Sequence, residues 1–208
     1  MASSENVKAR RQMILAAAEK VFDTYGYATT TVDAVAAEAG ISKGSIYNYF
    51  HSKEDLFHRV FNHAVSGMEA DTMRLLTKPI PASEKLQRLV DQWFQRLEYA
   101  RRIGRLVLEF WATAARHQQG ELAVTLRELY LRWRQRVSAI LAEGVAQGQF
   151  KHQFSSPFAG AMLLALLDGI QVQSQLGFGV DLDEEFLAAL KSAILTSIMA
   201  ENTDEEKT

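Results

Sequence analysis

The chain has 208 residues, of which 48% are hydrophobic and 23% charged, and its formal net charge is −2, which gives no support by itself for nucleic-acid binding. It contains no cysteine, which excludes disulfides and thiolate chemistry and favours a reducing compartment. The longest apolar run, residues 158–167, is well short of the ~18 residues that a membrane span needs, and the N-terminal segment lacks the apolar core of a signal peptide. We therefore expect a cytoplasmic protein with no membrane partner.

Apolar residues recur at spacings of three and four through most of the chain, and no long segment alternates with the period of a strand. The pattern predicts an all-α fold with about nine helices. The expected helices lie near residues 14–25, 31–39, 43–50, 53–76, 86–97, 103–115, 121–146 and 157–176, with a last helix that ends near residue 199.

Residues with particular backbone preferences mark several of the expected helix ends. Gly26 predicts the end of the first helix, because glycine readily takes the left-handed conformation that closes a helix. Thr30 and Ser52 are expected N-caps, each with an aspartate three residues later, and Ser156 before a proline is a third. Two prolines within residues 77–83 predict a break between helices.

Residues 32–50 have the spacing of a helix-turn-helix motif. Ala36, Gly40 and Ile46 occupy the positions at which the motif needs a small residue, a glycine with positive φ and a buried aliphatic anchor. Gly40 is expected to form the sharp turn, and Ser42 is expected to cap the second short helix.

The exposed face of that second helix combines small, hydrogen-bonding and aromatic side chains, which suits close approach to DNA. Lys53, just beyond it, suits a phosphate contact. The DNA contacts expected on these grounds are Ser42, Lys43, Gly44, Ser45, Tyr47, Asn48, Tyr49 and Lys53. The alternative for the aromatic residues is packing alone, which we expect for Phe50 and for part of Tyr49.

The segment GYATTTVDAVAAEAGISKGSIYNYFHSKEDLF, residues 26–57, resembles the DNA-binding domain of the tetracycline-repressor (TetR/AcrR) family. The resemblance implies a three-helix DNA-binding domain at residues 1–53, joined by a long fourth helix to an effector-binding and dimerisation bundle at residues 54–208. It adds Thr30 and Thr31 to the expected DNA contacts. It also implies a repressor that leaves a palindromic double-stranded operator when a small molecule binds.

A dimer is expected because one short recognition helix contacts too few base pairs for useful specificity, whereas two copies on a palindrome contact enough. The helix near residues 157–176 is apolar on every side, and the last helix is also too apolar to face solvent alone. The expected interface residues are Leu163, Leu167, Ile170, Leu187, Leu190 and Ile194. The alternative is that both helices are interior elements of a monomer.

The resemblance also implies a small-molecule effector site among the middle helices, and its candidate residues are Trp93, Glu109, Trp111, Tyr130 and Trp133. Aromatic residues at helical spacing can equally be core residues. Glu109 and Asp168 interrupt apolar segments, where a carboxylate is costly unless it has a partner; Arg105 is a candidate partner for Glu109. We expect an apolar effector with one or two polar groups.

No cofactor or metal is expected, because the chain has no cluster of histidine and acidic residues at metal-ligand spacing and no glycine-rich phosphate loop. Two alternatives to a ligand-responsive regulator remain. One is a DNA-binding regulator that needs no effector, and the other is a helical ligand carrier or enzyme with a vestigial N-terminal motif.

Overall fold

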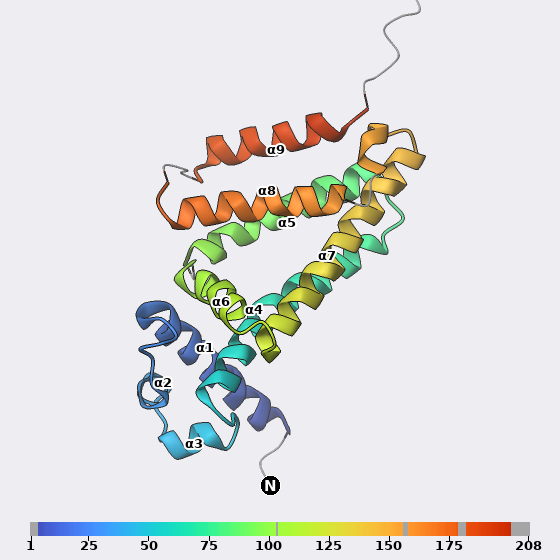
Figure 1. Cartoon of the computed structure of the whole chain (residues 1–208). Helices are drawn as coiled ribbons and strands as arrows, with labels where there is room; N and C mark the ends of the chain where they lie inside the picture. The colour runs from blue at the N-terminus through green and yellow to red at the C-terminus, as the bar shows by residue number, and fades with distance from the viewer. Residues whose placement is uncertain (1–3, 103, 156–157, 179–181, 201–208) are drawn as a thin grey trace, which may run out of the picture. The chain divides into compact units, whose positions relative to one another are not determined.

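The computed structural model describes residues 4–102, 104–155, 158–178 and 182–200. This part of the chain forms nine α-helices and no strand, which confirms the all-α prediction (Figure 1). The helices are α1 (Ser4–Tyr25), α2 (Val32–Glu38), α3 (Lys43–Tyr47), α4 (Lys53–Leu76), α5 (Ala82–Arg102), α6 (Gly104–Arg116), α7 (Glu121–Ala146), α8 (Ala159–Gln175) and α9 (Glu184–Ile198), with a 3-10 turn at His152–Ser155. None of the described helices has the length and apolar character of a membrane-spanning segment.

The chain divides into two compact units, and their boundaries pass through α4, α5 and α7. The first unit comprises Met1–Ala70 and Ala100–Leu126, and the second comprises Asp71–Tyr99 and Arg127–Thr208. The first unit therefore combines the N-terminal helices with α6 and the beginning of α7.

Aromatic side chains form the centre of the first unit. The Phe57 ring of α4 lies 5.1 Å from the Phe22 ring of α1 and 4.7 Å from the Phe110 ring of α6, measured between centroids. Aromatic pairs at these separations contribute packing energy beyond simple area burial. A cross-helix cap adds to this packing, because the Asp23 carboxylate of α1 accepts a hydrogen bond at 3.3 Å from the backbone N–H of Leu106, in the first turn of α6.

The second unit has an aliphatic core to which α5, α7, α8 and α9 all contribute. Its buried members include Leu86, Ile140, Leu141, Leu167 and Ile198. A partly buried ion pair crosses the edge of this core, with Lys85 Nζ of α5 2.9 Å from Glu143 Oε2 of α7. The apolar stripes that predicted these helices are the surfaces they bury against one another.

Of the N-caps predicted from the sequence that lie in the described part, two are confirmed and one is wrong. Ser42 and Ser52 accept hydrogen bonds from the backbone N–H groups of Ser45 and Asp55, as N-caps do. The prediction of Thr30 as the cap of α2 is wrong, because Thr31 holds that position. Ser156 and Pro157 lie outside the described residues.

Candidate nucleic-acid interface

A tight turn at Gly40 sets α3 against α2. Gly40 has φ +65°, and the backbone N–H of Ile41 donates to the Ala36 carbonyl at 3.0 Å. Ala36 and Ile46 are almost completely buried between the two helices. These observations confirm the helix-turn-helix geometry predicted from the spacing.

The Ser42 cap fixes the start of α3, a helix of only five residues. The Ser42 hydroxyl accepts from the Ser45 N–H at 3.2 Å and lies 2.8 Å from the Ser45 hydroxyl. Because the cap uses the Ser42 side chain, this residue positions the helix whether or not it also contacts DNA.

Side chains on the outer face of α3 are open to solvent. Lys43, Gly44, Tyr47 and Asn48 are exposed, and Tyr47 retains 46% of its accessible surface, which is unusual for a large aromatic residue. Ser45, an expected DNA contact, is half-buried. Tyr49 is half-buried and Phe50 is buried, as expected for residues that pack wholly or in part. The helix thus presents hydrogen-bonding groups and one free aromatic ring to a partner.

Lys43 is held in place by Asp33 of α2. Its Nζ lies 2.7 Å from Asp33 Oδ2, and this hydrogen bond raises the pKa of Lys43 above its ordinary value. Both side chains are exposed, so a phosphate can compete for the lysine.

Two of the expected DNA contacts have other roles in the structure. Thr30 is only 3% exposed, and its hydroxyl donates to the Gly26 carbonyl at 2.8 Å, so its side chain is unavailable to DNA. Thr31 is exposed at the start of α2, where its hydroxyl accepts from the Ala34 N–H at 3.2 Å. Thr31 can therefore face DNA, whereas Thr30 cannot.

Lys53 also has partners within the chain. Its Nζ donates to the backbone carbonyls of Tyr27 at 2.9 Å and Thr30 at 3.0 Å, and it lies 4.6 Å from the centroid of the Tyr27 ring. The ammonium group thereby closes the loop between α1 and α2 and is only half-exposed. A phosphate contact by Lys53 would have to break these hydrogen bonds.

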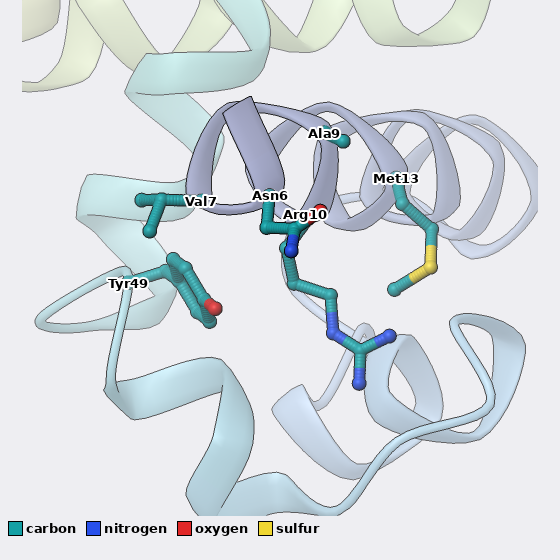
Figure 2. Close-up of a pocket in the computed structure, with 6 residues that line it drawn as sticks. All are labelled: Asn6, Val7, Ala9, Arg10, Met13 and Tyr49. Atoms are coloured by element: carbon teal, nitrogen blue, oxygen red, sulfur yellow. The ribbon is translucent and has the colours of Figure 1, made fainter. Parts of the chain in front are cut away.

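A groove beside α3 was not anticipated from the sequence. It has a volume of about 390 Å³ and is lined by Asn6, Val7, Ala9, Arg10 and Met13 of α1 and by Tyr49 (Figure 2). The basic run in residues 8–11 was the available signal, but its spacing did not indicate which cation faces α3.

The five expected effector residues fall in different units. Glu109 and Trp111 belong to the first unit, whereas Trp93, Tyr130 and Trp133 belong to the second. Glu109 Oε2 lies 3.8 Å from an Arg116 guanidinium nitrogen, so Glu109 has a partner. The side chain of Arg105, the partner expected from the sequence, lies outside the described part, and that pairing stays a prediction.

Within the second unit, aromatic residues adjoin a desolvated carboxylate. The Trp133 and Tyr130 rings are 5.6 Å apart in an edge-to-face arrangement, and Tyr130 donates a hydrogen bond to Asp168 of α8. Burial raises the pKa of Asp168 to about 6, and the Tyr130 hydrogen bond opposes this shift. Trp93 instead packs against the aliphatic core, with its ring 5.2 Å from that of Phe94.

Three expected interface residues are buried within the protomer. Leu163, Leu167 and Ile194 retain 8%, 5% and 4% of their surface and belong to the core of the second unit, so they have little area left for a partner. Their place in a dimer interface stays a prediction, and within the protomer they are core residues. Ile170, Leu187 and Leu190 are half-buried.

The exposed apolar residues of this region form a different row. Phe158, Met162 and Leu166 follow one another at intervals of four along α8 and its N-cap, and they are 72%, 69% and 45% exposed. Residues four apart lie on the same face of a helix. The exposed face of α8 is therefore a different one from the face that carries Leu163 and Leu167.

Two protein-family models match the chain. "Bacterial regulatory proteins, tetR family" matches residues 14–60, and "BetI-type transcriptional repressor, C-terminal" matches residues 82–200. The first covers the helix-turn-helix, and the second covers α5 to α9.

Curated relatives include regulators of similar length. The chain is 29% identical over 187 residues to YfiR of Bacillus subtilis, described as an uncharacterized HTH-type transcriptional regulator, covering 88% of this chain and 86% of YfiR. It is 28% identical over 173 residues to the HTH-type transcriptional regulator BetI of Ectopseudomonas mendocina, covering 80% of this chain and 82% of BetI. Its match to YhgD of Bacillus subtilis, at 37% identity, spans only 41% of that protein.

A solved structure shares the fold. The putative transcriptional regulator of Saccharomonospora viridis in complex with choline superimposes with a TM-score of 0.80 at 23% identity, covering 93% of this chain and all of that one. Because the BetI-type model spans more than half of the chain and the other model covers its helix-turn-helix, the protein belongs to the TetR family of bacterial transcriptional regulators.

Proposed function

We propose that this regulator is a homodimeric repressor that holds a palindromic operator through α3 of each copy and releases it when a small cation binds. DNA binding is assigned to residues 1–53, and effector binding and dimerisation to residues 54–208. The observation that carries the proposal is the exposed face of α3, where Lys43, Gly44, Tyr47 and Asn48 stand open beside a fixed turn.

A recognition helix of this kind enters the major groove, where base edges differ in their hydrogen-bond donors and acceptors. The Asn48 amide can pair with adenine, and Gly44 lets the backbone approach closely because it carries no side chain. Two copies related by a two-fold axis would place their helices about 34–36 Å apart, one turn of B-DNA.

The operator is best identified by selecting bound fragments from random duplexes with the full-length protein. We then expect Tyr47→Ala to weaken operator binding by about 100-fold, which corresponds to about 1.4 kcal/mol for each copy in the dimer. Tyr25→Ala is the matched control, because Tyr25 is 62% exposed but lies at the end of α1, outside α3. Equal losses of operator affinity in the two variants would show that α3 is not part of the DNA interface, provided that both variants retain the wild-type melting temperature.

The effector class is inferred from Asp168 and its neighbours. The pKa of Asp168 is shifted by burial and by the Tyr130 hydrogen bond, neither of which neutralises the carboxylate, so the ionised group can accept a cation. Trp133 and Tyr130 add aromatic rings, which attract cations and especially quaternary ammonium groups. An anionic effector would be repelled by the same carboxylate. The choline complex of the Saccharomonospora regulator supports this choice of cation.

Calorimetry with choline as the probe tests the effector proposal. We expect binding above pH 7, where Asp168 is ionised, and at least tenfold weaker binding to Asp168→Asn. Glu184→Gln is the control, because it removes an exposed carboxylate from α9 in the same unit. If neither choline nor another small cation binds while the operator still does, an effector-independent regulator becomes the better description.

A further inference from the structure

The groove lined by Asn6, Val7, Ala9, Arg10, Met13 and Tyr49, called the α1 groove below, lies next to the end of α3 (Figure 2). We infer that it is a second DNA contact, in which Arg10 binds a backbone phosphate at the edge of the major groove that α3 enters. The inference rests on the proposed binding of DNA through α3.

The position of the α1 groove follows from contacts within the first unit. Tyr49 lies two residues beyond the last residue of α3, and its carbonyl accepts a hydrogen bond at 3.5 Å from Arg11 Nη2 of α1. The Arg11 guanidinium also lies 5.5 Å from the centroid of the Phe50 ring. These contacts fix the N-terminal half of α1 against the segment that follows the recognition helix. A phosphate strand bordering α3 would therefore also run beside α1.

Arg10 differs from the neighbouring cationic side chains, because those already have partners within the chain. Arg11 is bound to Tyr49 and Phe50, Lys43 is paired with Asp33, and Lys53 donates to backbone carbonyls. The Arg10 side chain is exposed and has no hydrogen bond or ion pair to any described residue. Of these cations in the described part of the chain, Arg10 is thus the one that can bind a phosphate without first giving up a partner.

The lining of the α1 groove suits a phosphate better than an apolar ligand. In Figure 2 the side chains of Arg10 and Met13 and the Tyr49 ring lie on the side of α1 that faces the helix-turn-helix ribbon. A guanidinium donates in a planar fork that matches phosphate oxygens, and the Tyr49 hydroxyl can add a further donor. Among the described residues that line the groove, none is acidic.

The test compares two substitutions on the same helix. Arg10→Gln removes the cation in the groove, and Lys8→Gln removes an exposed cation that points about 200° away, at 100° per residue. Both variants lose one positive charge from the same stretch of α1. Their long-range electrostatic effects should therefore be similar, and only a direct contact distinguishes them.

Operator affinity is measured against salt concentration for the full-length wild type and three full-length variants, Arg10→Gln, Lys8→Gln and Arg10→Lys. The slope of log Kobs against log [salt] is negative, and Arg10→Gln should reduce its magnitude by about two units per dimer, one for each lost phosphate contact. Lys8→Gln should leave the slope unchanged. The loss for Arg10→Gln should be the same on random-sequence DNA, because phosphate contacts carry no sequence information. Arg10→Lys should retain most of the slope.

Equal changes in slope for Arg10→Gln and Lys8→Gln would overturn the inference, since they would indicate a diffuse field. An unchanged slope in Arg10→Gln would overturn it as well. If the wild type binds no DNA at all, the proposed function fails instead. Melting temperatures of the three variants, compared with that of the wild type, confirm that each is folded.

Discussion

Asp168 is a carboxylate in an otherwise apolar stretch of α8, where desolvation raises its pKa from 3.8 to about 6. The folded protein therefore keeps a proton that the unfolded chain releases. The protonated Asp168 carboxyl therefore contributes to the free energy of unfolding. Its contribution has its full value below pH ~4 and is lost as the pH rises through about 6. Two pKa units correspond to about 3 kcal/mol at most, and partial solvation of the carboxyl reduces that to about 1–3 kcal/mol.

Asp168→Asn should therefore make the protein more stable at pH 8 by about 1–3 kcal/mol and leave it almost unchanged at pH 4. The amide oxygen can still accept the hydrogen bond from Tyr130, so little packing is lost. Urea denaturation at the two pH values measures the difference, with Glu184→Gln as an exposed control. The same pH dependence in Asp168→Asn and in the wild type would show that Asp168 is not desolvated.

The contact between α7 and α8 depends on a glycine. A Cβ atom on Gly160 would lie 2.6 Å from the Arg134 carbonyl oxygen and 2.5 Å from the Ser138 hydroxyl, both on α7. The Arg134 carbonyl oxygen belongs to the backbone, so it cannot move aside unless α7 itself moves. In the same helix, a Cβ atom on Gly169 would meet nothing within 4 Å. A side chain at Gly160 would therefore clash with α7, whereas one at Gly169 would have room.

Gly160→Ala should lower the free energy of unfolding by about 1–3 kcal/mol through overpacking. Gly169→Ala should raise it by up to about 1 kcal/mol, because alanine has the higher helix propensity. Urea titrations of the two variants at one pH give the comparison. Two changes of the same sign would contradict the close approach of α8 to α7.

For the whole molecule, dimerisation is proposed to bury the exposed α8 row of Phe158, Met162 and Leu166. In a two-fold interface the same row is contributed by both copies, so one substitution acts twice. A charged residue placed in this row would lose its water on dimerisation, and it would lie close to the same charge of the partner protomer.

Met162→Glu should raise the dimer dissociation constant by at least 100-fold and weaken operator binding, because a monomer holds only a half-site. Light scattering after size exclusion gives the mass at several concentrations. Met73→Glu, which alters an exposed methionine of α4, should remain dimeric. A Met162→Glu variant that stays dimeric at nanomolar concentration would place the interface elsewhere.

Several helix ends and the helix-turn-helix could be read from the sequence, because the signals for them are local. The bounds expected for α7 agree with the structure, and the roles of Gly40, Ser42 and Ser52 are confirmed. Each depends on backbone geometry within a few residues along the chain.

Contacts between distant segments could not be read in this way. Whether Thr30 or Thr31 caps α2 depends on how the preceding loop packs, and the loop buries Thr30. Apolar periodicity indicates that Leu163 is covered but not whether its own protomer or a partner covers it. Lys53 meets carbonyls that lie more than twenty residues away in sequence.

The sequence by itself determined the all-α class, the order of the helices and the recognition motif, because helix propensity, caps and glycine turns act over one or two turns of backbone. Only the tertiary structure decided which cations remain available to DNA and which apolar side chains remain available to a partner. Those properties depend on which groups are brought together from separate helices, and the folded arrangement leaves Arg10 and the exposed α8 row open to solvent.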